Sequence, residues 1–320
     1  MKAYFPLLKK ILYLFVILSV TQCAPYKGIH ETSSVGPQVL KDTTGWTVDS
    51  VVKGITRYHY AGYYAPFSSR QNVNVVDIDL NSKQYKIILA DVREKDSLSS
   101  VCKRYPNAIT AINAGYFVVQ HEPEYTFIKI NNSIYSRVEA QPSDIYYWKH
   151  KGCFYFDNDL QEIGITYGNE KRYETMKYDN IISSASVLVY NGKPKGTSFV
   201  NPHVALDSLP YENPNRHQGT RFPRTAIALT SNKHLLLMVV DGKNKMTAGM
   251  TASEITRFLA GHFSVESALN MDGGGSSTLW MKGYPFNGIV NYPTDNRQYD
   301  HYGQRKIKTA LLVLPSNINK

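Results

Sequence analysis

The sequence has few cysteines and no arrangement of residues that suits zinc. Only three of its 320 residues are cysteines, Cys23, Cys102 and Cys153, and their separations fit no metal motif. His121-Glu122 is followed by Pro123, so a helical His-Glu-x-x-His is not formed there. A zinc hydrolase is therefore disfavoured. Cys102 and Cys153 are expected either to form one disulfide in an oxidising compartment or to remain two buried thiols.

Two other signals are missing. The formal net charge is +10, but no dense Lys/Arg stripe and no RNA-binding aromatic motif is present, so we expect no nucleic-acid partner. The segment Gly275-Ser-Ser-Thr278 lacks the second glycine of Gly-x-Ser-x-Gly, which argues against a serine hydrolase. A moderately basic charge instead favours acidic partners, such as phosphate-bearing glycans or anionic envelope surfaces.

The amino terminus carries the features of an export signal. Lys2, Lys9 and Lys10 precede the apolar run from Ile11 to Val20, which has about half the length of a membrane-spanning helix. The run and the following Cys23 resemble a bacterial lipoprotein signal, so residues 1–22 are predicted to be removed and Cys23 to be lipidated.

A lipid at Cys23 would anchor the protein to a membrane without spanning it, in the periplasm or at the cell surface. Gln22 stands where such signals prefer a small residue, so simple cleavage and retention as an anchor stay open. Removal of residues 1–22 lowers the net charge from +10 to +7.

The remainder predicts one catalytic domain of the α+β class, with a large, mixed, mostly β core and a few helices. Residues 23–45 read as a flexible tether and residues 46–320 as the domain, because no repeat or low-complexity segment divides the latter. Helices are predicted at Thr251–Ala260, ended by Gly261, and at Ser97–Tyr105. Apolar or alternating runs predict strands at Trp46–Ile55, Val73–Leu80, Tyr85–Ala90, Ala108–Ile112, Ile181–Tyr190, Thr225–Thr230, Leu235–Val240, Ala268–Met271, Thr278–Met281 and Thr309–Leu314.

A glycine cluster interrupts one of these apolar stretches, Ala268 to Trp280. Gly273, Gly274 and Gly275 follow Asp272 and precede Ser276 and Ser277. Because glycines weaken a strand, the chain is expected to need an unusual backbone conformation or a close approach there. Successive N–H groups in such a turn can form a nest for an anion, with Asp272 and the two serines at its rim. The alternative is a tight hairpin in which Asp272 bonds its own turn.

Other polar residues stand at the ends of predicted strands. Asn113 follows an apolar run, beside Gly115, and could donate to a substrate oxygen. Arg224 begins a strand and can bind phosphate through two nitrogens or form a surface ion pair. Asp241 closes a buried strand, as a catalytic acid or as a turn initiator. Glu254 occupies the N3 position of a capping box, Thr251-Ala-Ser-Glu254, which already gives it a structural role.

Taken together, these motifs resemble the phosphodiester glycosidase family in its bacterial, exported form. The similarity spans roughly residues 73–314, whereas Tyr125–Pro214 matches poorly and is expected to shape the substrate pocket. The resemblance implies an α+β domain that cleaves the bond between a sugar's anomeric carbon and a phosphodiester oxygen. The segments that carry it are Ile112-Asn-Ala-Gly-Tyr-Phe117, Pro223-Arg-Thr-Ala226, Val240-Asp-Gly-Lys243, Gly249-Met-Thr251 with Glu254, Asn270-Met-Asp-Gly-Gly-Gly-Ser-Ser277 and Asn291-Tyr-Pro293.

The implied reaction releases a sugar such as N-acetylglucosamine, leaves a phosphomonoester on a glycan and requires no cofactor. Asp272 is the first choice for the essential carboxylate and Asp241 the second, as nucleophile, base or oxocarbenium stabiliser. Arg224 would neutralise the phosphate, and Glu254 is a second-tier catalytic residue. The residues expected to bind substrate are Asn113, Gly115, Asn270, Gly273, Gly274, Gly275, Ser276 and Ser277.

One residue departs from the family pattern, and two alternative functions stay open. Lys243 stands where relatives often carry arginine, and lysine is a point charge rather than a planar fork. The protein could also be an envelope lipoprotein that binds phosphorylated glycans without cleaving them. Alternatively, Asp241 and Asp272 could hold Ca²⁺ or Mg²⁺ for hydrolysis at phosphorus.

Overall fold

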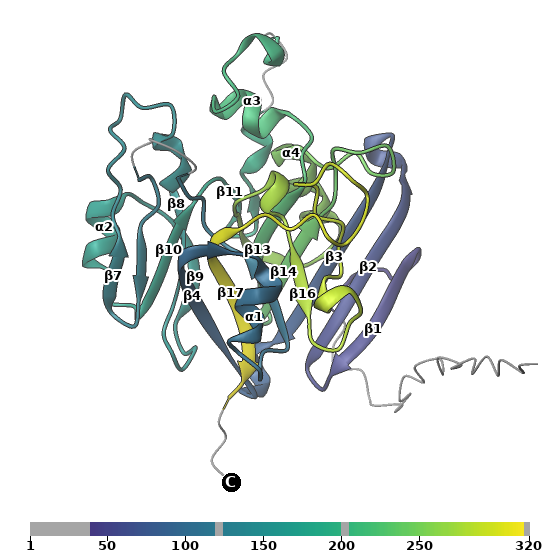
Figure 1. Cartoon of the computed structure of the whole chain (residues 1–320), viewed down its shortest axis with the longest axis horizontal. Helices are drawn as coiled ribbons and strands as arrows, with labels where there is room; N and C mark the ends of the chain where they lie inside the picture. Colours follow the sequence, from purple (N-terminus) through teal and green to yellow (C-terminus); the bar gives the residue numbers. More distant parts are fainter. Residues whose placement is uncertain (1–38, 119–123, 200–204, 317–320) are drawn as a thin grey trace, which may run out of the picture. The chain divides into compact units, whose positions relative to one another are not determined.

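The computed structural model describes residues 39–118, 124–199 and 205–316. The described residues belong to one compact unit, drawn in Figure 1. The predicted signal peptide, Cys23, most of the predicted tether and His121-Glu122-Pro123 lie outside the described residues. Within the described residues, no helix is long and apolar enough to cross a membrane.

Three sheets, built from antiparallel strand pairs, form this unit. The largest has eight strands in the order β1-β2-β3-β14-β13-β15-β11-β12, the second five in the order β7-β6-β10-β8-β9, and the third four in the order β16-β5-β17-β4. In Figure 1, β1 and β2 lie on one side of the unit and β7 on the opposite side. The strands are β1 (Trp46–Val52), β2 (Ile55–Tyr64), β3 (Ser69–Asp79), β4 (Tyr85–Asp96), β5 (Thr110–Asn113), β6 (Ile128–Ile130), β7 (Ser133–Ser136), β8 (Gly152–Phe156), β9 (Ile163–Tyr167), β10 (Asn180–Ser184), β11 (Val187–Tyr190), β12 (Lys193–Pro194), β13 (Arg224–Thr230), β14 (His234–Val240), β15 (Val265–Asn270), β16 (Leu279–Met281) and β17 (Ile307–Pro315).

The central strands are apolar throughout because both of their faces are covered. In β14, Leu235 and Leu237 face the core shared with the other two sheets, whereas Leu236 and Met238 pack in a second core beneath helix α4 (Ala252–His262). Strands buried on both faces read as continuous hydrophobic runs rather than as alternating ones. The sheets therefore form layers, with α4 outside the eight-stranded sheet.

Four α-helices accompany the sheets in the described part of the chain. Helix α1 (Leu98–Lys103) packs on the outer face of the four-stranded sheet, and α4 covers the eight-stranded one. Two short helices, α2 (Glu170–Thr175) and α3 (Pro214–Gly219), complete the set. Both helical predictions are confirmed, although α4 continues through Gly261 to His262, so Gly261 does not end it.

The last residues of the predicted tether are part of the packed unit. Val39 and Leu40 are buried in the core beneath α4, and Leu40 forms a β-bridge with Phe263. The two remaining cysteines, Cys102 and Cys153, are free and buried, and burial raises the pKa of both thiols to about 12. Of the two alternatives for these cysteines, the structure shows two buried thiols.

A mostly β, α+β fold is confirmed, with two corrections to individual strands. The run Trp46–Ile55 contains a turn at Lys53-Gly54 that separates β1 from β2. The run Ile181–Tyr190 is two strands in different sheets, β10 and β11. The sequence did not indicate β2, because its Tyr-, His- and Arg-rich composition hides the alternation, nor the short strands β6 to β9.

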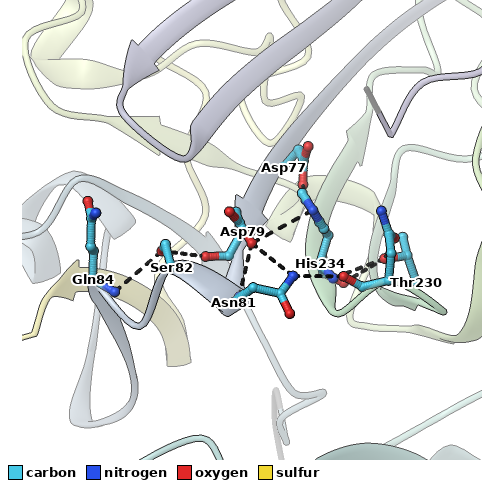
Figure 2. A network of polar contacts seen from close by, with 8 residues as sticks. Asp77, Asp79, Asn81, Ser82, Gln84, Thr230 and His234 are labelled. Atoms are coloured by element: carbon cyan, nitrogen blue, oxygen red, sulfur yellow. Dashed lines mark hydrogen bonds and ion pairs between the residues drawn. The ribbon is translucent and has the colours of Figure 1, made fainter. Parts of the chain in front are cut away.

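The two ends of the eight-stranded sheet differ in character. At one end, β13 begins at Arg224, opposite the last residue of β14, Val240. At the other end, a polar network joins β3 to β14 (Figure 2), in which Asp77 Oδ1 lies 2.7 Å from His234 Nδ1. The backbone N–H of His234 also donates to Thr230 Oγ1 at 2.9 Å. The first end carries the candidate active site.

Candidate active site

A cavity of about 640 Å³ opens at the end of the sheet where β13 begins. Arg224 is the first residue of β13, and Asp272 follows the end of β15 by two positions. Both residues line the cavity, as do Gly273, Gly274 and Gly275. The antiparallel pairing of β13 with β15 brings these segments together, since Ala226 is opposite Asn270.

Arg224 is a fully buried cation. Its side chain is 0% exposed, and Nε donates to the carbonyl of Met250 at 2.9 Å. Nη2 donates to the carbonyls of His217 (2.7 Å) and Thr220 (2.9 Å). Nη1 has no hydrogen-bond partner, and no carboxylate pairs with this guanidinium among the residues that the structure describes. Burial lowers the pKa of Arg224, yet arginine stays protonated in proteins.

Asp272 is a partly buried carboxylate on the cavity wall. Burial raises the pKa of Asp272 to about 6, while Ser276 and the positive charges of Lys149 and Arg305 hold it from rising further. Both backbone groups of Asp272 are hydrogen-bonded, because its N–H donates to the carbonyl of Ala114 at 3.0 Å and its carbonyl accepts from Asn113 Nδ2 at 2.7 Å. A carboxyl group with a pKa near 6 is poised for acid–base or nucleophilic work near neutral pH.

The glycine cluster allows close contacts between neighbouring segments and does not form an open anion-binding nest. The N–H of Gly274 donates to the carbonyl of Pro223 at 2.8 Å, so this donor is not available to an anion. A Cβ at Gly273 would lie 2.9 Å from Pro223 O, and one at Gly275 would lie 2.5 Å from Asp295 Oδ1. Gly274 alone has a left-handed backbone, with φ of +62°. The glycines therefore let β13 and the Asp295 loop approach the segment that carries Asp272.

Ser276 and Ser277 are both fully buried. Neither lines the cavity, and the two backbone N–H groups donate to Gly273 and Gly274 carbonyls, each at 3.2 Å. Ser276 acts on the site indirectly, because its hydroxyl lowers the pKa of Asp272. Their predicted place at the rim is thus wrong for these side chains, which lie behind the cavity wall.

The two predicted substrate-binding amides do not line the cavity either. Asn113 Nδ2 donates to the carbonyl of Asp272 at 2.7 Å, and Asn113 Oδ1 accepts from Thr225 Oγ1 at 2.7 Å and from Thr278 N at 3.1 Å. Asn270 Nδ2 donates to Tyr116 Oη at 3.2 Å and to the carbonyl of Ala185 at 3.0 Å. Both amides position the residues that do line the cavity.

Gly115, like Gly273 and Gly275, stands where a side chain would collide with a neighbouring segment. A Cβ there would lie 2.9 Å from Ile182 Cδ1 and 3.2 Å from Thr126 Cγ2. Its N–H donates to Thr309 Oγ1 at 2.9 Å. Gly115 thus allows the segment after β5 to lie close to β10, and it does not line the cavity.

Asp241 is buried away from the cavity lining. Its Oδ1 accepts from Asn291 Nδ2 at 2.8 Å and from the N–H of Tyr292 at 3.1 Å. Burial nevertheless raises the pKa of Asp241 to about 7. In this structure Asp241 anchors the Asn291-Tyr292 segment to the end of β14.

Glu254 also has structural partners. The reciprocal bonds of the capping box are present, with Thr251 Oγ1 accepting from Glu254 N at 3.1 Å. The carboxylate accepts from Arg221 Nε at 3.0 Å, and Glu254 does not line the cavity. The structure assigns it to the start of α4.

Lys149 is a cavity residue that sequence reasoning missed. Its side chain is buried, and its ammonium lies 2.6 Å from Glu212 Oε2. The same ammonium lies 4.9, 4.8 and 5.2 Å from the ring centres of Tyr116, Tyr125 and Tyr146, a cation–π arrangement. The aromatic stretch around this lysine, Tyr146 to His150, was the one signal in the sequence that pointed to it.

Further lining comes from the region Tyr125–Pro214 and from His217, just beyond it. Tyr211, Glu212 and His217 line the cavity together with Lys149 and Tyr125. Burial, with the positive charges of Arg224 and Lys149, lowers the pKa of His217 well below its usual value, so this imidazole is neutral. The region Tyr125–Pro214 thus helps to shape the pocket, as expected.

The described residues contain no group of three or more His, Cys, Asp or Glu side chains that could hold a metal ion. Asp241 and Asp272 are therefore not joined in such a cluster. The cations around Asp272 are side chains of this chain, namely Lys149 and Arg305.

A buried guanidinium with one unpaired nitrogen and a carboxyl group of raised pKa thus line the same cavity of an α+β domain. Residues 106–314 match the phosphodiester glycosidase family, and the chain belongs to that family. None of the curated proteins matches the chain in sequence.

Several solved structures share the fold, including the following two. One is the catalytic domain of zebrafish N-acetylglucosamine-1-phosphodiester alpha-N-acetylglucosaminidase, auto-inhibited by its pro-peptide, with a TM-score of 0.59 and 17% identity over 81% of this chain and 82% of that one. The other is a hypothetical protein from Synechocystis, with a TM-score of 0.53 and 14% identity over 85% of this chain and 64% of that one.

Proposed function

We propose that this protein hydrolyses a sugar-1-phosphodiester at the anomeric carbon–oxygen bond. The sugar, such as N-acetylglucosamine, is released, and a phosphomonoester stays on an envelope or environmental glycan. The observation that carries the proposal is Arg224, a fully buried guanidinium in the cavity wall whose Nη1 has no hydrogen-bond partner among the described residues. A buried donor left unpaired costs free energy that a bound phosphate would recover.

The chemistry of the leaving group fits this site. Cleavage of the carbon–oxygen bond adds a second negative charge to the phosphate, and Arg224 is placed to stabilise that charge. The second pKa of a phosphomonoester is about 6, so the phosphate leaves without a strong general acid. What the reaction needs is a fixed cation at the phosphate and a carboxylate at the anomeric carbon.

Asp272 is the carboxylate that we assign to the anomeric carbon. It lines the cavity with Arg224, and Lys149 and Arg305 keep part of its population ionised by lowering a pKa that burial raises. Asp241, the other predicted carboxylate, already accepts hydrogen bonds from Asn291 and Tyr292 and does not line the cavity. The ionised Asp272 then acts as nucleophile or as stabiliser of the oxocarbenium ion.

The aromatic lining supports a sugar as the bound group. Tyr116, Tyr125, Tyr211 and Phe222 line the cavity beside polar and charged residues. The lining therefore offers aromatic ring faces together with many hydrogen-bonding and charged groups. The apolar faces of a pyranose ring would contact these aromatic rings while its hydroxyls meet the polar residues.

The proposal extends to the place of action. The lipoprotein-like signal would attach the protein through Cys23 to the bacterial envelope, where phosphorylated glycans occur as partners. The expected net charge of +7 after removal of residues 1–22 favours such anionic surfaces.

The test is hydrolysis of α-GlcNAc-1-phospho-6-mannose in water enriched in oxygen-18. Label in the released sugar, seen by mass spectrometry, would establish cleavage of the carbon–oxygen bond. Label in the phosphate would show attack at phosphorus and overturn the proposal. Binding without turnover across a panel of sugar-1-phosphodiesters would instead identify a glycan-binding protein.

Two matched variants assign the carboxylate. Asp272→Asn should abolish turnover, whereas Asp241→Asn should remain folded and active, because an asparagine oxygen can still accept from Asn291 and Tyr292. The reverse result would make Asp241 the essential group and contradict the assignment of Asp272.

A further inference from the structure

The mouth of the cavity carries an unusual set of exposed residues. The lining residues that are exposed to solvent are Tyr211, Lys243, Asp295, Arg297 and Gln298. Three of these five carry a formal charge, two of them positive. A substrate group that reaches the solvent-exposed part of the lining would meet these residues.

The negative charge at the mouth is already neutralised. Asp295 Oδ1 lies 2.6 Å from Arg305 Nη2 and accepts from Arg305 Nε at 2.8 Å. Gly275 allows this pair to lie against the glycine cluster, since a Cβ there would lie 2.7 Å from Arg305 Nη2. The ion pairs of the described residues include neither Lys243 nor Arg297. The mouth therefore presents two uncompensated positive charges.

The backbone at both cations is held in a conformation that long side chains seldom adopt. Lys243 and Arg297 each have φ of +61°, in the left-handed region that Gly and Asn usually occupy. The N–H of Arg297 donates to the carbonyl of Thr294 at 3.0 Å. The Lys243 ammonium lies 5.2 Å from the ring centre of Phe222, another lining residue. Such backbone outliers cluster at ligand sites, and these two direct cations to one opening.

We infer that Lys243 and Arg297 bind a second anionic group, carried by the part of the substrate that extends from the cavity beyond the scissile phosphodiester. This inference rests on the proposed function and narrows its substrate class. The substrate is then a glycan with more than one negative charge, such as one with a further phosphate or a carboxylate near the cleaved bond. Arg224 binds the reacting phosphate, and the two cations at the mouth select what is attached to it.

The test compares three substrates with the same sugar and the same scissile phosphate. The group beyond the phosphate is neutral ethyl in the first, carries an additional phosphate in the second and carries a carboxylate in the third. We expect the wild type to show a kcat/KM about tenfold higher for a charged substrate than for the neutral one, which corresponds to about 1.4 kcal/mol contributed together by two exposed cations. The two charged substrates distinguish phosphate from carboxylate as the second group.

The variants remove the positive charge while keeping an unbranched side chain at each position. In the double variant Lys243→Met, Arg297→Met, the ratio of kcat/KM values for charged and neutral substrates should fall from about ten to about one. Lys245→Met is the matched control, because Lys245 is exposed but does not line the cavity, and the ratio should stay at the wild-type value.

The outcomes separate this inference from the function on which it rests. Equal rates for all three substrates in the wild type, or an equal loss of preference in Lys245→Met, would overturn the inference and leave the glycosidase intact. Cleavage of none of them would overturn the proposed function and the inference with it.

Discussion

Replacement of Arg224 by lysine is the perturbation that tests the site most directly, because it keeps the charge and removes the planar fork. In the wild type, the guanidinium donates to three backbone carbonyls, those of Met250, His217 and Thr220, and keeps Nη1 for a ligand. One ammonium cannot satisfy these carbonyls and a phosphate together. Loss of a single donor to a developing oxyanion lowers kcat by about 100- to 1,000-fold, and we expect that loss in kcat/KM for Arg224→Lys.

The same substitution affects stability, so a control is needed. Buried carbonyls left without a donor cost about 1–3 kcal/mol each, and Arg224→Lys should lower the free energy of unfolding by about 2–4 kcal/mol. Arg57→Lys is the matched control. Arg57 is buried in β2 and donates to Asn74 Oδ1 and Asp49 Oδ2, outside the cavity lining.

The assay combines urea unfolding, steady-state kinetics and thermal shift with inorganic phosphate. Phosphate should raise the Tm of the wild type and of Arg57→Lys but not of Arg224→Lys, since a ligand stabilises only the state that binds it. A folded Arg224→Lys protein with wild-type kcat/KM and an unchanged response to phosphate would refute the assignment of Arg224 to the phosphate.

Three further predictions concern pH. The kcat/KM should rise with pH through about 6 as Asp272 ionises. The Lys149 charge lowers the pKa of Asp272, so Lys149→Met should move this rise to higher pH. A pH–rate profile of the variant with the rise at the wild-type pH would contradict this coupling. Burial raises the pKa of Asp241 from 3.8 to about 7, so the folded state loses stability as pH rises between these values, by about 1.4 kcal/mol per pH unit at most. Asp241→Asn should reduce this dependence of the free energy of unfolding on pH, as measured by urea titrations. Burial alone would lower the pKa of His234, but the hydrogen bond and charge of Asp77 outweigh it and raise the pKa above 6.5 (Figure 2). The stability from this pair is present below pH 6.5 and is lost as pH rises above it, and His234→Asn should remove this loss in urea titrations.

Sequence patterns predicted the apolar strands well because these strands are buried on both faces. Thr225–Thr230 and Leu235–Val240 correspond closely to β13 and β14. The run Ile181–Tyr190 is equally apolar, yet it crosses from one sheet to another after β10. The position of such a crossing depends on tertiary contacts, such as the hydrogen bond from the Asn270 amide to Ala185 O. The local sequence pattern therefore does not predict where the chain passes from one sheet to the other.

The candidate site was predicted in part for a related reason. Asp272 and Arg224 line the cavity, whereas Asn113 and Asn270 lie outside the lining and donate hydrogen bonds to residues that form it. All four are polar residues at strand ends, and the sequence cannot tell which of them faces solvent. That distinction depends on which side of each strand end faces the cavity, a property of the packed sheets.

Two sets of residues around the cavity bear on how substrate choice is built into the fold. One set lies in the segments that resemble the family, and the other lies between Tyr125 and Pro214. The segments that resemble the family supply the cation, the carboxylate and the amides that position them. Between Tyr125 and Pro214, Lys149 and Glu212 supply an ion pair, and Tyr125 and Tyr211 supply part of the aromatic lining. If reaction type is carried by the first group and sugar identity by the second, substitutions at Lys149 should change the order of preference among sugars. Substitutions at Arg224 should instead lower turnover of every sugar by a similar factor, because each substrate shares the same phosphate.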